Sequence, residues 1–201
     1  MTKTIILASN NQGKIAEFNH LLSPLGYDIK PQGEFNVEDA VEDGLTFIEN
    51  AILKARHACS QTGLASLADD SGLEVDYLNG APGIYSARFA GEHGNNLANN
   101  ELLLKKLNGV PTHERTARFH CVLAYMKHKD DPTPIVVHGT WEGRILESIE
   151  GEQGFGYDPV FFVPECGCSA ASLPKEVKNA ISHRSQALAQ LLTYLTPKVP
   201  F

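Results

Sequence analysis

TIILA, residues 4–8, is followed directly by the polar loop SNNQG, residues 9–13, and by Lys14 at the start of an amphipathic segment. An apolar run of this length is typical of a buried strand, and the apolar residues after Lys14 recur at helical spacing. Those residues are Ile15, Phe18, Leu21 and Leu22. A buried strand that leads into a helix through a short polar loop predicts an α/β fold.

Further along the chain, helical and strand patterns alternate. TFIE at 46–49 fits a capping box and opens a second helix that ends near Gly63. The other expected elements are strands over 64–68, 73–77, 116–127, 135–141 and 160–163, a helix over 96–107, and a closing helix with Leu188, Leu191, Leu192 and Leu195. We therefore expect an α/β fold with a mixed, elongated sheet flanked by helices, parallel at the start and antiparallel later.

Length and composition bound the possible functions. The chain has 201 residues and a formal net charge of -7, which suits one domain over 1–201, or two small lobes sharing a core. The negative charge argues against non-specific nucleic-acid binding. No apolar stretch approaches the ~20 residues that span a bilayer, and the amino terminus does not resemble a signal peptide. We expect a cytoplasmic protein with no membrane or nucleic-acid partner.

The four cysteines do not indicate a disulfide framework or a metal site. Cys59 and Cys121 fall on apolar faces and are expected to be buried. Cys166 and Cys168 are separated by one residue, which is not C-x-x-C spacing, and no second pair supplies further zinc ligands. We interpret these two as loop cysteines.

The loop at 9–14 has the features of a phosphate cradle. Gly13 allows a tight turn, the N–H groups at the helix start can face an anion, and Lys14 adds a full charge. The loop is not a Walker A motif, which would need Gly in place of Ala8 and Ser or Thr in place of Ile15. An ordinary strand-to-helix connection with a solvated lysine remains an alternative.

The acidic segment DDSG, residues 69–72, follows the predicted strand at 64–68. Ligands of open α/β sheets collect beyond the carboxyl ends of the strands, so this segment and the loop at 9–14 could line one cleft between two lobes. Adjacent carboxylates repel each other unless a cation, hydrogen bonds or solvent offset the repulsion. Mg²⁺ prefers such oxygen ligands, and Glu42 offers another. A plain turn is the alternative, because Asp, Ser and Gly favour turns.

GFGYDP, residues 154–159, combines flexible backbone with two aromatic side chains. These rings could stack on a nucleotide base or pack in the core. Near the last helix, Lys178, His183 and Arg184 add cations that oppose the dipole of the helix start, so an anionic ligand would explain them. A solvated surface is the alternative.

Six segments, taken together and in order, closely resemble the inosine/xanthosine triphosphate pyrophosphatase family, the Ham1-like nucleotidases. They are SNNQGK at 9–14, EDGLTFIENA at 42–51, DDSGL at 69–73, GAPGIYSAR at 80–88, FGYDP at 155–159 and SHR at 182–184. Ser9 stands where many relatives have Thr, and Tyr157 where some have Trp. The resemblance implies a homodimer that uses Mg²⁺ to hydrolyse non-standard purine nucleoside triphosphates (ITP, dITP, XTP) to the monophosphate and pyrophosphate, which cleanses the nucleotide pool.

The resemblance also implies residue roles. Asp70 would be the proton acceptor and a metal ligand, and Glu42 a second metal ligand. The residues expected on the triphosphate are Ser9, Asn10, Asn11, Gln12, Gly13, Lys14 and Lys54, with Ser71 also on the substrate. Those expected around the nucleoside are Phe155, Gly156, Tyr157, Asp158, Lys178, His183 and Arg184. Donors such as Arg184, His183 or backbone N–H groups would suit the six-position carbonyl of hypoxanthine or xanthine and oppose the amino group of adenine.

Two other functions are compatible with parts of the pattern. Maf-like nucleotide pyrophosphatases, which act on pyrimidine or modified nucleotides, also open with a strand and a Ser-containing phosphate loop, but they lack the segments at 155–158 and 182–184. A nucleotide sensor would bind a triphosphate without cutting it, and the acidic pair at 69–70 argues against that.

Overall fold

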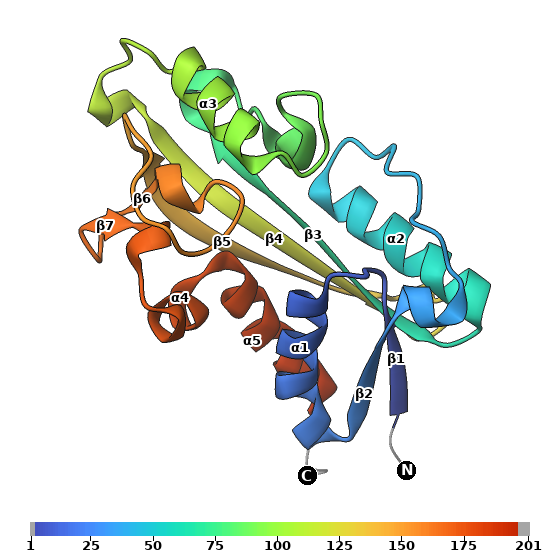
Figure 1. Cartoon of the computed structure of the whole chain (residues 1–201). Coiled ribbons are helices and arrows are strands. Elements are labelled where there is room, and N and C mark those ends of the chain that lie inside the picture. The colour runs from blue at the N-terminus through green and yellow to red at the C-terminus, as the bar shows by residue number, and fades with distance from the viewer. Residues whose placement is uncertain (1–2, 197–201) are drawn as a thin grey trace. The chain divides into compact units, whose positions relative to one another are not determined.

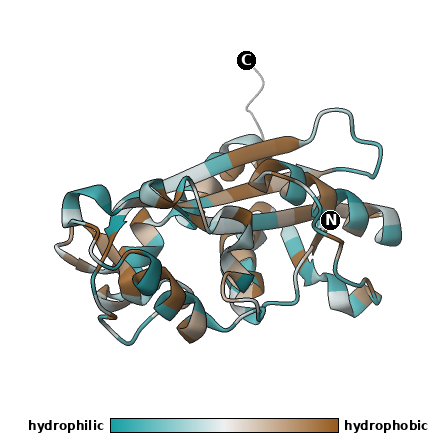
Figure 2. Ribbon diagram, turned by 90° about the horizontal axis from the view of Figure 1, so that it is seen from above, coloured by the Kyte–Doolittle hydropathy of each residue, from teal (hydrophilic) through white to brown (hydrophobic). Residues whose placement is uncertain are grey.

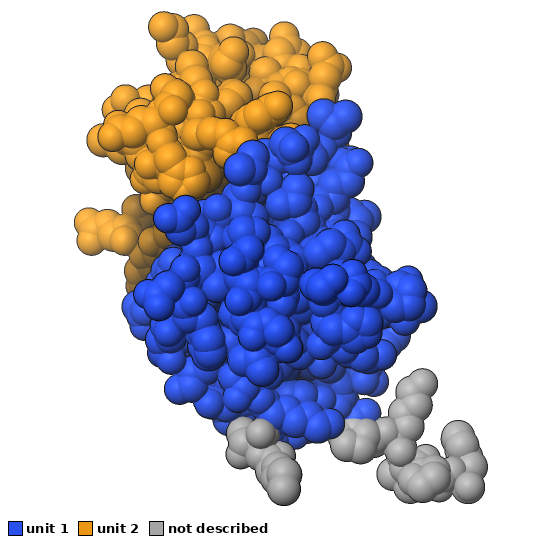
Figure 3. Space-filling model, turned by 90° about the vertical axis from the view of Figure 1, so that its right-hand side faces the viewer, with its two compact units in different colours: residues 1–70, 122–138, 187–201 blue, residues 71–121, 139–186 orange. Residues whose placement is uncertain are grey.

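The computed structural model describes residues 3–196, which form two compact units built from interleaved segments of the chain. Unit 1 holds the described residues up to Asp70, Val122–His138 and those from Ala187 onward (Figure 3). Unit 2 holds Ser71–Cys121 and Gly139–Gln186. Within residues 3–196, no helix is both long enough and apolar enough to cross a membrane.

The strands form one sheet in the order β2-β1-β3-β4-β5-β6-β7 (Figure 1). They are β1 (Lys3–Leu7), β2 (Tyr27–Pro31), β3 (Ala65–Val75), β4 (Thr116–Met126), β5 (Ile135–Ile145), β6 (Phe161–Val163) and β7 (Cys168–Ser169). β1 runs parallel to β2 and β3, whereas β6 runs antiparallel to β5 and β7. The mixed sheet, parallel first and antiparallel later, is confirmed.

The helices begin and end close to their sequence signals. They are α1 (Gln12–Leu22), α2 (Phe47–Thr62), α3 (Asn96–Lys106), α4 (Lys175–Ile181) and α5 (His183–Leu195). Thr46 Oγ1 accepts a hydrogen bond from the N–H of Glu49 at 3.1 Å, and the Glu49 carboxylate accepts one from the N–H of Leu45 at 2.8 Å. Gly63, at φ 70°, ends α2. The capping box is thus confirmed, with its return bond at Leu45 rather than Thr46.

In unit 1, helices lie on both faces of the strands. Through Ala51, Ala55 and Cys59, α2 packs on Ala68 of β3 and on alternate apolar residues of β4. Because successive strand side chains point to opposite faces, the residues on either side of Ala68 face away from α2. That second face meets α1 and the end of α5 (Figure 1). The apolar residues gather along the strands, while exposed loops are mostly hydrophilic (Figure 2).

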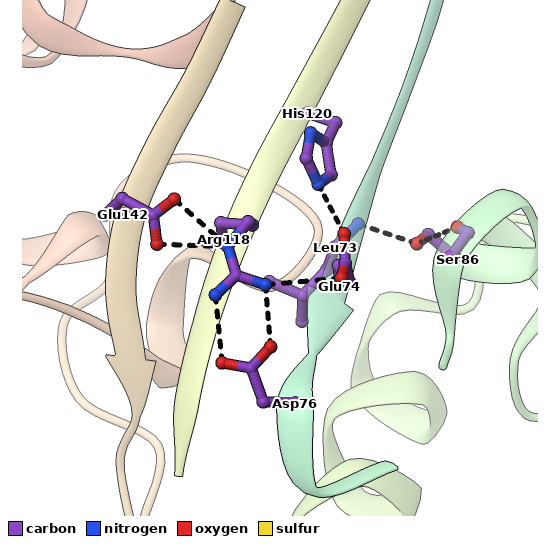
Figure 4. A network of polar contacts seen from close by, with 8 residues as sticks. Leu73, Glu74, Asp76, Ser86, Arg118, His120 and Glu142 are labelled. Carbon is purple, nitrogen blue, oxygen red and sulfur yellow. Dashed lines mark hydrogen bonds and ion pairs between the residues drawn. The ribbon is translucent and has the colours of Figure 1, made fainter. Parts of the chain in front are cut away.

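In unit 2, one face of the strands carries the core and the other carries charges. Leu73, Phe119 and Trp141 belong to a buried cluster that also includes Leu103 of α3 and Leu107, which directly follows that helix. The opposite face carries a charged network centred on Arg118 (Figure 4).

Arg118 of β4 connects its strand to the two neighbouring strands, β3 and β5. Its guanidinium donates to Asp76 at 2.7 and 2.9 Å, to Glu142 at 3.0 and 3.1 Å, and to Glu74 at 3.2 Å (Figure 4). A 2.7 Å hydrogen bond joins His120 Nε2 to Glu74. The hydrogen bonds from Arg118 lower the pKa of Asp76, so this pair is ionised at neutral pH.

Several elements differ from the sequence predictions. β2, β7 and α4 were not predicted, and β5 continues to Ile145 instead of ending near 141. Helical spacing would place Ile48 on the apolar stripe of α2, but it lies in the first turn of the helix and is 45% exposed. Tyr77 lies in a 3-10 turn after β3 and is exposed rather than on a strand face.

Candidate functional site

Asp69 and Asp70 lie inside β3, which runs unbroken from Ala65 to Val75. The turn that Asp, Ser and Gly favour does not form here, so that alternative is wrong. Lys14 Nζ of α1 lies 2.6 Å from the Asp69 carboxylate, and Lys54 Nζ of α2 lies 2.6 Å from that of Asp70. Each carboxylate thus has its own cation, and the backbone remains extended because neither side chain needs to turn to solvent.

Lys54 connects the two residues predicted as metal ligands. Its ammonium group contacts the carboxylate of Asp70, the carbonyl oxygen of Asp69 at 3.0 Å and the carboxylate of Glu42 at 3.2 Å. We call Lys14, Glu42, Lys54, Asp69 and Asp70 the lysine–carboxylate cluster. Its members come from α1, α2, β3 and the loop before α2, all in unit 1.

Burial shifts the protonation of this cluster. Burial raises the pKa of Asp70 to about 6 against the opposing effect of Lys54, and Glu42 and Asp69 add smaller upward contributions. Burial is therefore the main cause of the shift, not the neighbouring Asp69. Burial also lowers the pKa of Lys54, but the carboxylates around it outweigh this effect and raise the pKa overall. At pH 7 and above, Asp70 is mostly ionised and is a stronger proton acceptor than an ordinary aspartate.

The loop before α1 is held by its own side chains. Ser9 Oγ accepts from the N–H of Asn11 at 3.1 Å, and Asn11 Oδ1 caps α1 by accepting from the N–H of Lys14 at 3.0 Å. Asn10 Oδ1 accepts from the N–H of Gly33 at 2.8 Å, and a Cβ on Gly33 would lie 2.5 Å from that oxygen. Helix geometry leaves the first N–H groups of α1, at Gln12 and Gly13, without intrahelical acceptors. The loop thus presents donors suited to an anion.

The cluster suits a divalent cation that is also bound by phosphate. Glu42 and Asp70 supply hard carboxylate oxygens around one ammonium group, and Mg²⁺ usually takes one or two protein carboxylates plus substrate phosphate and water. The described residues include no group of three or more His, Cys, Asp or Glu side chains arranged to hold a metal alone. The donor set therefore fits Mg²⁺ bound together with a polyphosphate.

The second group of predicted residues surrounds the loop at 154–158 in unit 2. Phe155 is 58% exposed, with Lys178 Nζ 4.7 Å and Arg184 Cζ 5.8 Å from its ring centroid. Asp158 is buried, and its carboxylate accepts from the N–H of Phe155 at 2.7 Å and from Lys178 Nζ. A Cβ on Gly154 would lie 2.2 Å from the Asp158 carboxylate, so this close turn requires glycine. The loop presents an open aromatic face beside two cations.

Four predicted nucleoside contacts are buried: Tyr157, Asp158, His183 and Arg184. Tyr157 is 4% exposed and part of the unit 2 core, and its hydroxyl donates to the carbonyl oxygen of Ser86 at 2.7 Å. The exposed ring of Phe155 is free to stack on a base, whereas the ring of Tyr157 packs in the core. His183 stacks on Phe119 with ring centroids 4.8 Å apart, at the start of α5. Ser71 is half-buried in β3.

The structure adds residues that were not predicted as part of either group. Asp69 forms an ion pair with Lys14. The sequence feature that could have indicated this is its place beside Asp70, because adjacent residues of a strand point to opposite faces of the sheet. Asn99 and Asn100 of α3 are buried, and their helical spacing to Leu103 was the signal there. The hydrogen bond from the Tyr157 hydroxyl to the Ser86 carbonyl oxygen joins segments far apart in the chain, and nothing in the sequence indicates it.

The chain is similar to proteins of one family over nearly its whole length. The Ham1 family model matches residues 5–194. A dITP/XTP pyrophosphatase of Vibrio vulnificus is 59% identical over 193 residues, which cover 96% of each chain, and one of Salmonella typhimurium is 58% identical, covering 95% of this chain and 97% of that one.

Comparison with solved structures gives the same result. A HAM1 protein from Coxiella burnetii matches with a TM-score of 0.93 and 50% identity, covering 97% of this chain and 99% of that chain. A nucleoside-triphosphatase, dITP/XTP pyrophosphatase, from Mycobacterium abscessus matches with a TM-score of 0.80 and 42% identity, covering 94% and 98%. These matches favour the Ham1-like interpretation of the sequence over the Maf-like one. The chain belongs to the Ham1 family.

Proposed function

We propose that this protein hydrolyses the non-standard purine nucleoside triphosphates dITP, XTP and ITP to the monophosphate and pyrophosphate. The observation that carries the proposal is the lysine–carboxylate cluster, in which Lys14 and Lys54 each contact one of two adjacent buried aspartates at 2.6 Å. Two ammonium groups and the loop N–H groups suit a polyphosphate, while the carboxylates suit its counter-ion and an attacking water. The names of the Vibrio and Salmonella relatives support the same substrates.

In this proposal the cluster binds the triphosphate and activates water. The loop at 9–14 and Lys14 hold the β and γ phosphates, and Lys54 and Ser71 contact the substrate. Water attacks the α phosphorus, the bond from that phosphorus to the bridging oxygen breaks, and pyrophosphate leaves with the bonding electrons. Asp70 accepts the proton of the water; its pKa of about 6 supports this role, because it is ionised yet basic at neutral pH.

Glu42 and Asp70 would hold Mg²⁺ together with the phosphates. When bound, the ion neutralises charge on the phosphate oxygens and acidifies water. Lys54 contacts both carboxylates, and its positive charge offsets the repulsion between them.

The loop at 154–158 would receive the purine base. Phe155 offers its exposed ring for stacking, and Gly156 provides backbone beside it. Arg184 and His183 would donate to the six-position carbonyl, which adenine lacks. Asp158 and Tyr157 would support the loop from within, and Lys178 would bind the substrate from its position over Phe155.

A substrate panel tests the proposal. The protein is incubated with Mg²⁺ and, separately, ITP, XTP, dITP, GTP, ATP and TTP, and the products are identified. We expect pyrophosphate from ITP, XTP and dITP at rates well above those from ATP. Preferential turnover of TTP would instead support a Maf-like activity, and tight binding of ITP without turnover would support a sensor.

Two further expectations belong to this proposal: that the protein works as a homodimer and that it acts in the cytoplasm. Light scattering coupled to size-exclusion chromatography tests the first. Fractionation of cells that produce the protein tests the second.

A further inference from the structure

Asn100 contacts the loop at 154–158 from the side of α3. Its side chain is buried, with the residue 3% exposed, and Nδ2 donates to the carbonyl oxygen of Gly156 at 3.0 Å. Gly156 lies between the exposed Phe155 and the buried Tyr157 and has a φ of 63°. A bond to this carbonyl therefore fixes the peptide between Gly156 and Tyr157, and with it the backbone of the glycine that follows Phe155, which is otherwise the most permissive of any residue.

The other hydrogen bonds of this loop hold its two ends, and the N–H of Asp158 donates to the Phe155 carbonyl oxygen across the turn at 3.2 Å. Asp158 accepts from the N–H of Phe155, which holds the start of the loop, and Tyr157 donates to Ser86, which holds its end. Asn99, the neighbour of Asn100, instead serves the segment before α3: its amide donates to Ser86 and Ala87 carbonyls and accepts from the N–H of Ala90. Adjacent asparagines on one helix thus hold different parts of unit 2.

We propose that Asn100 is a positioning residue that sets the Gly156 peptide, and through it the orientation of the Phe155 ring that receives the base. The inference rests on the proposed function, in which the loop at 154–158 binds the purine. Asn100 touches no substrate in this account. It acts on base selection because a ring displaced by about 1 Å loses much of its effect on the bound substrate. Loss of the Nδ2 donor leaves the half-buried Gly156 carbonyl without this bond and frees the peptide to rotate.

The test compares Asn100→Asp, which removes the donor at nearly constant volume, with Asn100→Ala. Ser169→Ala is the matched control, because the buried Ser169 hydroxyl also donates to a backbone carbonyl in unit 2, at Glu150, outside the loop. KM and kcat are measured for ITP and ATP, and inhibition by inorganic tripolyphosphate reports on the phosphate-binding cluster. Thermal unfolding identifies variants that are folded at the assay temperature.

We expect both Asn100 variants to raise KM for ITP by about 10- to 100-fold and to reduce the ratio of kcat/KM for ITP over ATP, because a displaced base no longer meets the donors that adenine cannot use. Inhibition by tripolyphosphate should change less than about twofold, and Ser169→Ala should keep the wild-type ratio. If Asn100→Asp does not fold, the Asn100→Ala variant decides.

Phe155→Ala separates failure of this inference from failure of the proposed function. An unchanged ITP-to-ATP ratio in the Asn100 variants, with a reduced ratio in Phe155→Ala, would overturn the role of Asn100 alone. An unchanged ratio in all three would contradict the assignment of this loop to the base.

Discussion

Asp69 and Asp70 are adjacent in β3, yet their carboxylates contact different lysines: Asp69 contacts Lys14 of α1, and Asp70 contacts Lys54 of α2, each at 2.6 Å. The alternation of side chains along a strand explains this, because it sends neighbouring residues to opposite faces of the sheet. Two like charges that a turn would have exposed to water are instead separated and individually paired. The same strand thereby presents one carboxylate to Lys14 at the start of α1 and the other to Lys54, which also contacts the candidate metal ligand Glu42.

Replacing Asp70 by Asn should separate binding from turnover. The amide keeps the shape and a hydrogen-bonding oxygen but loses the proton acceptor and the anionic ligand. We expect kcat for ITP to fall by ~10² or more, while binding of ITP, measured by calorimetry in the absence of turnover, changes little. Asp76→Asn, outside the cluster, is the control and should retain kcat. Near-normal turnover in Asp70→Asn would remove Asp70 from the mechanism.

Asp70 should also make the free energy of unfolding depend on pH in metal-free buffer. Its pKa is about 6 in the folded protein against 3.8 as the reference, so the folded state binds more protons between pH 4 and 6. The free energy of unfolding contributed by this group therefore falls as pH rises through that window. The shift corresponds to at most about 3 kcal/mol.

Urea unfolding of the wild type and Asp70→Asn, in EDTA from pH 4 to 7, measures this effect. The stability of the variant minus that of the wild type should increase with pH and level off above about pH 6. A difference that stays flat, or decreases with pH, would contradict the folded-state pKa.

Replacing Lys54 by Met should move the acid limb of the pH–rate profile. Lys54 lowers the pKa of Asp70, whereas burial, Glu42 and Asp69 raise it. Without the ammonium group, Asp70 should require a higher pH to ionise, so the acid limb of kcat/KM for ITP shifts to higher pH and KM rises. Lys129→Met, which removes an exposed lysine paired with Asp130, should leave the profile unchanged. An acid limb at the wild-type pH would show that Lys54 does not act on Asp70.

Arg118 should matter for folding rather than for chemistry. It donates hydrogen bonds to three carboxylates across the strands of unit 2 (Figure 4). Arg118→Met leaves those carboxylates to repel one another, and we expect a loss of about 1–3 kcal/mol in the free energy of unfolding. The KM for ITP should be unchanged where the variant is folded. A stability equal to that of the wild type would mean that solvent replaces the network at no cost.

The sequence predicted the parts of the fold that local patterns govern. The apolar run at 4–8, the cap at Thr46 and the long alternation over 116–127 each mark an element that the structure contains. β2, with only one buried residue, and the two-residue β7 carry too little periodicity to predict. The sequence placed the acidic segment after a strand ending at 68, with a plain turn as one alternative; in the structure the contacts of Lys14 and Lys54 accompany a strand that continues through it.

For the candidate site, the sequence identified residue types but not their partners. It paired Asp70 with Glu42, and the structure brings both to Lys54. It left open whether Phe155 and Tyr157 stack on a ligand or pack in the core, and burial separates them. It did not connect Asn100 or Ser86 with the site: helical spacing indicates only that Asn100 is buried, and a bond from a side chain to a distant carbonyl leaves no pattern along the chain. The expected cleft between two lobes remains a prediction.

The most direct test of the central claim is the fate of the phosphate chain. ITP is hydrolysed with Mg²⁺ in ¹⁸O-labelled water, and the products are separated and analysed by mass spectrometry. Attack at the α phosphorus predicts IMP that carries the label and pyrophosphate that does not. IDP with labelled orthophosphate, or label in the pyrophosphate, would contradict it.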